Sequence, residues 1–147
     1  VRANAGDVYQ PVQETFSFTG GDFCDVVGDK IYIAPMLFLV SNKNPFNQEK
    51  REYPVDFGFP FQDKYAINIE IPEGYEVESI PAVANLQTQQ NICSFKYNIQ
   101  VTGNKIQLVV IQDIHNSIVN PVDYPALQES FKKMTEKQNE KIVLKKI

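Results

Sequence analysis

The chain has 147 residues, 43% of them hydrophobic and 22% charged, and a net charge of −4. A chain of this length is expected to form one domain with a buried core, and its negative charge argues against a nucleic-acid partner. No apolar run reaches the ~18 residues that a membrane-spanning helix needs, because Pro35 interrupts the longest run, Ile31–Val40. We therefore expect a globular domain without a membrane span in this chain, and Val1 in place of methionine indicates a trimmed start.

The N-terminal part of the chain predicts a tail followed by strands. Residues 1–11 are small and polar and end at Pro11, so we expect a linker or tail there and a single domain over residues 12–147. Alternation of apolar and polar residues predicts a first strand over Val12–Phe18, and the glycines of residues 19–22 predict a turn.

The next predicted strand is the apolar run Lys30–Val40. Pro35 lies inside this run and lacks a backbone donor, which restricts the run to a sheet edge, a bulge or two shorter strands. A loop over Ser41–Phe46 follows.

The stretch Arg51–Pro81 carries the clearest strand pattern. Apolar residues alternate with polar or small ones on both sides of a loop, and this period of two indicates antiparallel strands with one buried face. A turn at residues 72–74, Pro-Glu-Gly, ends the second run. The alternating apolar residues are Val55, Phe57 and Phe59 in the first run and Ile67, Ile69 and Ile71 in the second.

A hairpin is predicted in the region that follows. Leu86–Gln89 is expected to be a short strand, and two longer strands, Ile92–Val101 and Lys105–Ile114, are joined by the tight turn Thr102-Gly103-Asn104. In the second strand apolar residues occupy both faces, so we expect other parts of the chain to pack against both faces. Ile106, Leu108 and Val110 share one face, and Val109 and Ile111 the other.

Helical periodicity occurs once, over residues 124–138. Asp123 is the expected N-cap, Pro125 is tolerated in the first turn, and the C-terminal lysines interleaved with glutamates indicate a solvated face. A last strand is expected over Lys141–Lys145. The predicted fold is mainly β, an antiparallel β-sandwich with one C-terminal amphipathic helix. The apolar stripe of this helix consists of Tyr124, Leu127, Phe131 and Met134.

A thiol active site needs a cysteine, a histidine base and an orienting carboxylate. The candidates are Cys24 or Cys93, His115, and Asp113 or Asp123. Neither cysteine is predicted at a helix N-terminus, where a thiolate is stabilised. Cys93 is expected to point into the core, and we favour two reduced thiols over a disulfide. We therefore expect no catalytic residues.

Metal and aromatic sites have weak support. One histidine and two distant cysteines cannot form a zinc site, and the spacing of Asp22, Asp25 and Asp29 does not match a calcium-binding EF-hand loop. We expect neither a metal nor a cofactor. Aromatic residues near the centre of the chain could stack on a sugar or peptide, but the simpler interpretation is that they fill the core and its edge. These residues are Tyr53, Phe57, Phe59, Phe61, Tyr65 and Tyr75.

The run NPFNQEKREYPVDFGFP (44–60), followed by IEIPEGYEVESIP (69–81), resembles a domain of unknown function in Gram-negative, Bacteroidetes-type bacteria. The likeness extends back through GDKIYIAPMLF (28–38) and forward to IVLKK (142–146), and none of these motifs is catalytic. In that family the domain is C-terminal to a transglutaminase-like domain of a multi-domain protein.

The resemblance implies a non-catalytic accessory domain that supports or positions a neighbouring domain of the same polypeptide, in the periplasm or cell envelope. An envelope binding module for glycan or peptide is the alternative, and a thiol enzyme is a third hypothesis. The ligand, if there is one, is unknown from the sequence.

Overall fold

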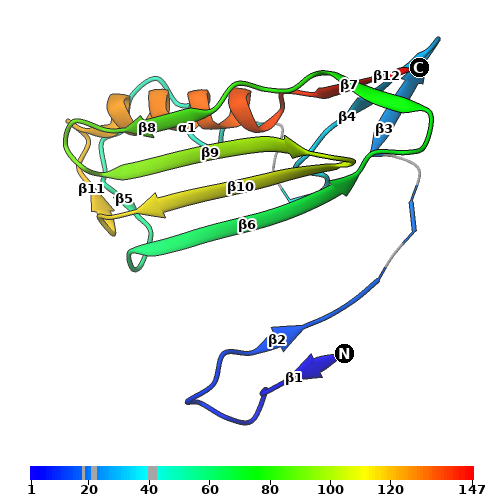
Figure 1. Ribbon diagram of the computed structural model, residues 1–147. Helices are drawn as coiled ribbons and strands as arrows, with labels where there is room; N and C mark the ends of the chain where they lie inside the picture. The colour runs from blue at the N-terminus through cyan, green and yellow to red at the C-terminus, as the bar shows by residue number, and fades with distance from the viewer. Residues whose placement is uncertain (18, 21–22, 40–42) are drawn as a thin grey trace.

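The computed structural model describes residues 1–17, 19–20, 23–39 and 43–147, and it is mainly β with one helix near the C-terminus. One layer is a four-stranded antiparallel sheet of order β6-β10-β9-β8. A second sheet of order β3-β4-β12-β7 and the helix α1 pack over one face of the first sheet (Figure 1). This arrangement fits the predicted antiparallel sandwich, with the helix completing the second layer. The first sheet contains β6 (Phe61–Glu70), β8 (Ala84–Gln87), β9 (Cys93–Thr102) and β10 (Lys105–Ile114), and the second β3 (Cys24–Val27), β4 (Lys30–Ile33), β7 (Tyr75–Ser79) and β12 (Ile142–Lys146).

The inner face of the first sheet forms the core. Alternate residues of β9 and β10 point to this face, as the period of a strand requires, and Phe95, Tyr97 and Val110 are completely buried there. The predicted shared face of β10 is therefore confirmed. On the opposite face Val109 and Ile111 are only half-buried, so the expected cover on that side is incomplete.

The helix α1 (Tyr124–Gln138) has the predicted bounds and buries Tyr124, Leu127 and Met134. Asp123 occupies the N-cap position, but its side chain makes no capping hydrogen bond. The ring of Phe131, the remaining residue of the predicted stripe, packs against the core but is less buried than these three. This ring is half-buried and meets the ring of Phe46 edge to face, with centroids 4.7 Å apart.

Two of the predicted turns are confirmed, whereas the turn predicted over residues 19–22 lies partly outside the described residues. The β9–β10 hairpin turns at Gly103 (φ +60°), and the turn between β6 and β7 places Gly74 at φ +80°. Both angles lie in the left-handed region, which a residue without Cβ adopts at little cost.

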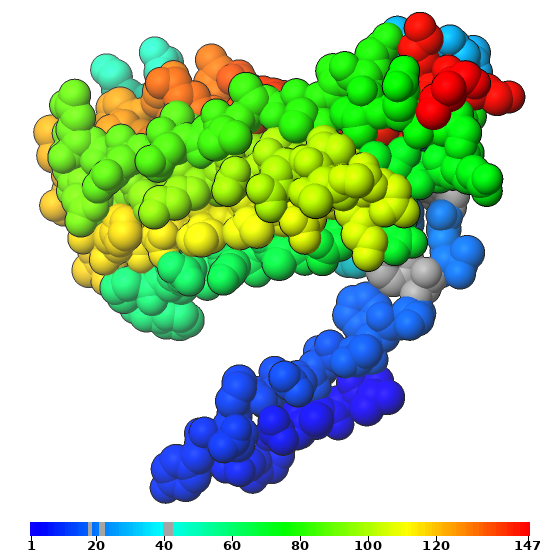
Figure 2. Space-filling model, in the orientation of Figure 1, coloured from blue at the N-terminus to red at the C-terminus, as the bar shows by residue number. Residues whose placement is uncertain are grey.

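One expectation in the N-terminal part is wrong, and one predicted run forms a strand over only part of its length. Instead of a strand over Val12–Phe18, the structure has β2 (Gln13–Glu14), which pairs with β1 (Arg2–Ala3) in a small exposed hairpin that projects from the sheets (Figures 1 and 2); Phe18 lies outside the described residues. The strand predicted over Lys30–Val40 ends at Ile33 because a turn containing Pro35 follows it, and Val40 again lies outside the described residues.

The alternating run with Val55, Phe57 and Phe59 also forms a shorter strand than predicted. Only β5 (Val55–Asp56) forms, paired with β11 (Ile118–Val119), and Val55 is buried. Phe57 is half-buried, whereas Phe59 is 68% exposed, so the predicted alternation ends after Phe57. Within the described ranges the model contains no helix with the length and apolar character needed to cross a bilayer.

Candidate functional site

The two cysteines lie in different environments, and both thiols are free. Cys24 is exposed on β3, whereas Cys93, at the start of β9, is 1% exposed, which confirms that it faces the core. Burial raises the pKa of the Cys93 thiol, and hydrogen bonds with Ser130 and Thr88 lower it by less. Cys93 is thus held as a neutral thiol, not as a nucleophilic thiolate.

His115, the candidate base, lies with a different group. Its Nε2 is 3.3 Å from Ser94 Oγ at the exposed surface. Ser94 directly follows Cys93 in β9, and successive strand residues point to opposite faces. The structure therefore separates Cys93 and His115 between the two faces of one sheet.

Ser94 also donates to Asp113 Oδ2 over 3.2 Å, and Asp113 Oδ1 accepts from Gln62 Nε2 over 2.6 Å. These three residues and His115 form a polar row across β6, β10 and β9. In a Ser-His-Asp triad the carboxylate orients the imidazole, which then takes the serine proton. Here the carboxylate binds the serine directly, so the row connects strands but does not form the triad relay.

Sequence reasoning named Asp113 and His115 but missed Ser94. The register of the β9–β10 hairpin, in which Ser94 pairs with Asp113, was the available signal. Asp123, the alternative carboxylate, lies at the start of α1 and takes no part in the row.

Of the acidic residues Asp22, Asp25 and Asp29, Asp25 is paired with a lysine. Asp25 Oδ2 pairs with Lys141 Nζ at 2.6 Å, and Asp22 lies outside the described residues. No cluster of three or more acidic, histidine or cysteine side chains suited to a metal occurs among the residues that are described.

Most of the central aromatic residues belong to the core. Phe46 lies at the centre of this group, with its ring centroid 6.1 Å from Phe57 and 6.1 Å from Tyr124. These contacts join the loop before β5 to α1. Tyr53 and Phe59 are the exceptions, with exposed fractions of 77% and 68%. Phe57, Phe61, Tyr65 and Tyr75 are half-buried against the core.

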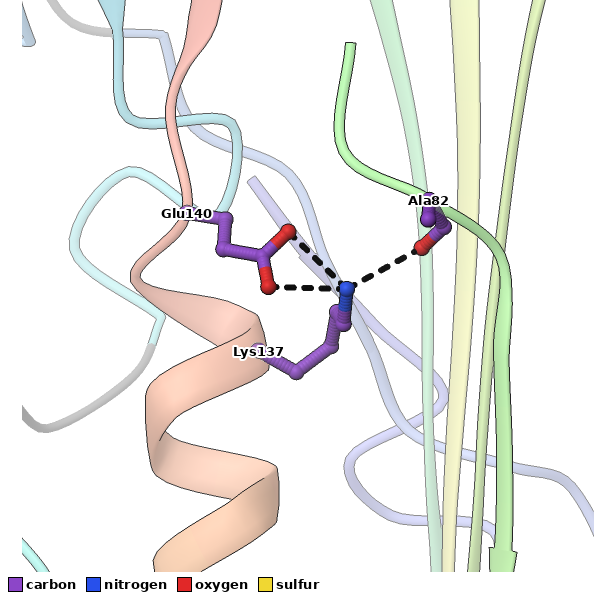
Figure 3. A network of polar contacts seen from close by, with 3 residues as sticks. All are labelled: Ala82, Lys137 and Glu140. Atoms are coloured by element: carbon purple, nitrogen blue, oxygen red, sulfur yellow. Dashed lines mark hydrogen bonds and ion pairs between the residues drawn. The ribbon is translucent and has the colours of Figure 1, made fainter.

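One flank of α1 is closed by a lysine. Lys137 Nζ donates to Glu140 Oε2 over 2.9 Å and to the carbonyl oxygen of Ala82 over 3.2 Å, which joins the helix to the segment before β8 (Figure 3). The same Nζ lies 6.0 Å from the centre of the Tyr97 ring, within the range of a cation–π contact. Beneath this contact the Tyr97 hydroxyl is buried without a hydrogen-bond partner in the described part of the chain.

The other flank of α1 contains a cavity of about 190 Å³. Leu39, Lys43 and Pro45 of the loop before β5 contribute to its wall. The remaining wall belongs to the sheet and the helix and mixes apolar with amide side chains. It consists of Tyr65, Gln112, Phe131, Met134, Thr135 and Gln138.

Two residues of this cavity were missed by the sequence reasoning. Gln112 interrupts the inward-facing series of β10, between Val110 and Ile114, and Gln138 follows Met134 by four residues on the helix. Both occupy positions where the pattern requires an apolar side chain, and such departures were the signal that could have identified them.

The chain matches the family DUF3858, described as a domain of unknown function with a solved structure, over residues 29–144. No curated protein matches it. The fold is similar to a crystal structure described as "a putative protease from Parabacteroides distasonis", with a TM-score of 0.57 and 13% sequence identity. The likeness covers 67% of this chain but 19% of the other, so at this identity it concerns the fold of a part of a longer protein.

Proposed function

Because the chain belongs to the DUF3858 family, we propose that it is a non-catalytic accessory domain of a larger, transglutaminase-like protein. In this proposal it supports or positions a neighbouring domain of the same polypeptide, in the periplasm or cell envelope of a Gram-negative bacterium. The observation that carries the proposal is the likeness to only 19% of a chain described as a protease. Peptidase or acyl-transfer chemistry would then reside in the remainder of such a protein.

The arrangement of the candidate catalytic residues supports the non-catalytic part of the proposal. Cys93 is buried as a neutral thiol, and His115 lies on the opposite face with Ser94. A thiol nucleophile requires its base within hydrogen-bond reach, and neither cysteine is paired in this way in the described structure.

Iodoacetamide labelling tests this proposal. In the Cys24→Ser variant, Cys93 should react slowly while the chain is folded, and His115→Ala should not change the rate. Cys24 itself, which is exposed, should react like an ordinary free thiol. Rapid, pH-dependent labelling of either cysteine that is lost in His115→Ala would instead support a thiol enzyme.

The accessory role is tested in the full-length protein. Removal of residues 29–144 should lower the melting temperature of the remaining domains, whereas the isolated chain should fold alone and show no hydrolase activity. An unchanged melting temperature would contradict a supporting role.

Two exposed rings favour a second function, an envelope module that binds glycan or peptide. Tyr53 and Phe59 expose their rings at either end of a short loop segment, and exposed aromatic faces stack on sugars and peptide side chains. Calorimetric titration with peptidoglycan fragments should then show binding that Tyr53→Ala or Phe59→Ala weakens. Absence of binding by the unaltered chain would exclude this function.

A further inference from the structure

The cavity beside α1 contains amide groups that the protein itself leaves without partners. Gln138 is 7% exposed and lines the cavity, yet in the described part of the chain no hydrogen bond reaches its side-chain amide. Gln112 lies opposite on β10, half-buried, and its amide is likewise without a partner among the described residues. Both amides face the cavity and are reached by solvent, since the Tyr97 hydroxyl is the one fully buried side-chain atom without a partner among the described residues. A ligand in the cavity can therefore bond to both of them.

The chemistry of these two groups defines what would satisfy them. Each amide offers one acceptor oxygen and two donor hydrogens and carries no charge. A carboxamide or peptide amide of the ligand also has an N–H donor and a carbonyl acceptor, so it can donate to one glutamine and accept from the other. Lys43, the lysine of the wall, already has an interaction of its own, so the two neutral amides are the polar groups of the wall that a ligand would meet first.

The remaining walls and the volume define the rest of the ligand. Phe131, Met134 and Tyr65 present apolar or aromatic surface to the cavity. Its volume of about 190 Å³ exceeds that of an engineered cavity of ~150 Å³ that binds benzene. One ring or one short branched chain therefore fits, with a polar head group beside it.

We propose that this cavity binds a small uncharged ligand with an apolar body of about one ring and a carboxamide or peptide amide head group. Gln112 and Gln138 bind the head group, and Phe131, Met134 and Tyr65 pack on the body. The two amides make no hydrogen bond to a described residue, so the head group can bond to both, and the head group, and not only the apolar body, determines affinity. The site is independent of any thiol chemistry and of the accessory role.

The test is a titration of the complete chain, followed by nuclear magnetic resonance of the glutamine side-chain amides and the α1 backbone. Three probes of similar size separate the contributions: benzamide, benzoate and toluene. We expect saturable shifts at Gln112 and Gln138 with benzamide, and affinity weaker by about ten-fold or more for toluene, which cannot hydrogen-bond. Benzoate should also bind more weakly, because its charge would be taken from water and Lys43, the lysine of the wall, already has an interaction of its own.

A fourth probe distinguishes two sources of the same head group. N-acetylphenylalaninamide carries its amides on a peptide backbone. If it binds more tightly than benzamide, the natural ligand is a peptide segment; if it binds more weakly, the ligand is a free small molecule. Either result is consistent with an amide-binding cavity.

Matched variants assign the effect to the two glutamines. Gln138→Leu and Gln112→Leu should each reduce the preference for benzamide over toluene several-fold, whereas Gln90→Leu, an exposed glutamine in the β8–β9 turn, should preserve it. If a cavity variant does not fold, the comparison of benzamide with toluene on the unaltered chain still tests the proposal. The proposal is overturned if benzamide causes no shift at the cavity up to its solubility limit, or if toluene binds as tightly as benzamide.

Discussion

The two flanks of α1 differ in how completely they close against the sheet. On the β8–β9 flank the inner residues Phe95 and Tyr97 are completely buried, and Lys137 joins the helix to the segment before β8. On the β6–β10 flank Tyr65 and Ile67 are only half-buried, and the cavity occupies the space that a closed core would fill. The same helix thus packs tightly on one side and incompletely on the other.

The closed flank contributes mainly to stability, whereas the open flank has a cavity that could bind a ligand. On the closed flank every inward position of β9 is apolar or aromatic, and packing of that kind provides most of the stability of a small domain. On the open flank two glutamines occupy inward positions. Burying an amide contributes less to stability than burying an apolar side chain, and the two glutamines fit the amide-binding role proposed above for the cavity.

The largest effect is expected on the closed flank. Phe95→Ala should reduce the free energy of unfolding by about 3–5 kcal/mol, because it removes a completely buried ring and leaves a cavity. Ile67→Ala, on half-buried β6, should cost about half as much. Urea unfolding followed by circular dichroism measures both, and equal losses would contradict the difference between the flanks.

Phe131, which lines the cavity on the open flank, should show a smaller effect than Phe95. Its ring is half-buried and packs on Phe46, so Phe131→Ala should cost about 2 kcal/mol, less than a fully buried phenylalanine. Lys132→Ala, on the exposed face, should change stability by less than about 0.5 kcal/mol. If the two substitutions are equally mild under urea, Phe131 does not contribute to the helix–sheet contact.

The sequence predicted the elements in which local pattern and packing agree. The bounds of α1 follow from its apolar stripe, and those of the β9–β10 hairpin follow from two alternating runs around Gly103. The N-terminal strand was predicted too long because alternation alone does not determine which residues pair. The strand β2 pairs with β1 over Gln13–Glu14, and Val12 and Phe16 on either side of it are exposed. Pairing between distant segments is not encoded in local periodicity.

The candidate site was predicted less well, for a related reason. Sequence alone suggested that Cys93 is buried, but it could not show that His115 contacts Ser94 and lies away from the thiol. Gln112 and Gln138 are 26 positions apart in the chain and become neighbours across one cavity only when α1 packs on β10. Each one alone looks like a minor irregularity in an apolar pattern.

A smaller effect, of opposite sign, is expected in the cavity. Gln138→Met keeps a similar volume and replaces the amide of a 7% exposed residue, which makes no hydrogen bond to a described residue, with an apolar thioether, so the free energy of unfolding should rise by about 1 kcal/mol. Gln90→Met, on the exposed turn, should leave it unchanged. Thermal and urea unfolding compare the two, and a loss of stability in Gln138→Met would mean that the amide has a partner within the protein.

The smallest effect at neutral pH is expected at Tyr97, on the closed flank. Its hydroxyl has no partner, so Tyr97→Phe should change the free energy of unfolding by less than about 1 kcal/mol at pH 7. Burial, followed by the nearby carboxylate of Glu140, raises the pKa of Tyr97 above its ordinary value of 10.0. In alkaline solution the unfolded chain therefore loses this proton while the folded chain retains it. The unfolded state then binds fewer protons, so the free energy of unfolding should fall as the pH rises above 10. Tyr97→Phe should make this fall less steep, whereas a parallel decline in both proteins would show that Tyr97 is accessible to solvent and that this flank is not closed.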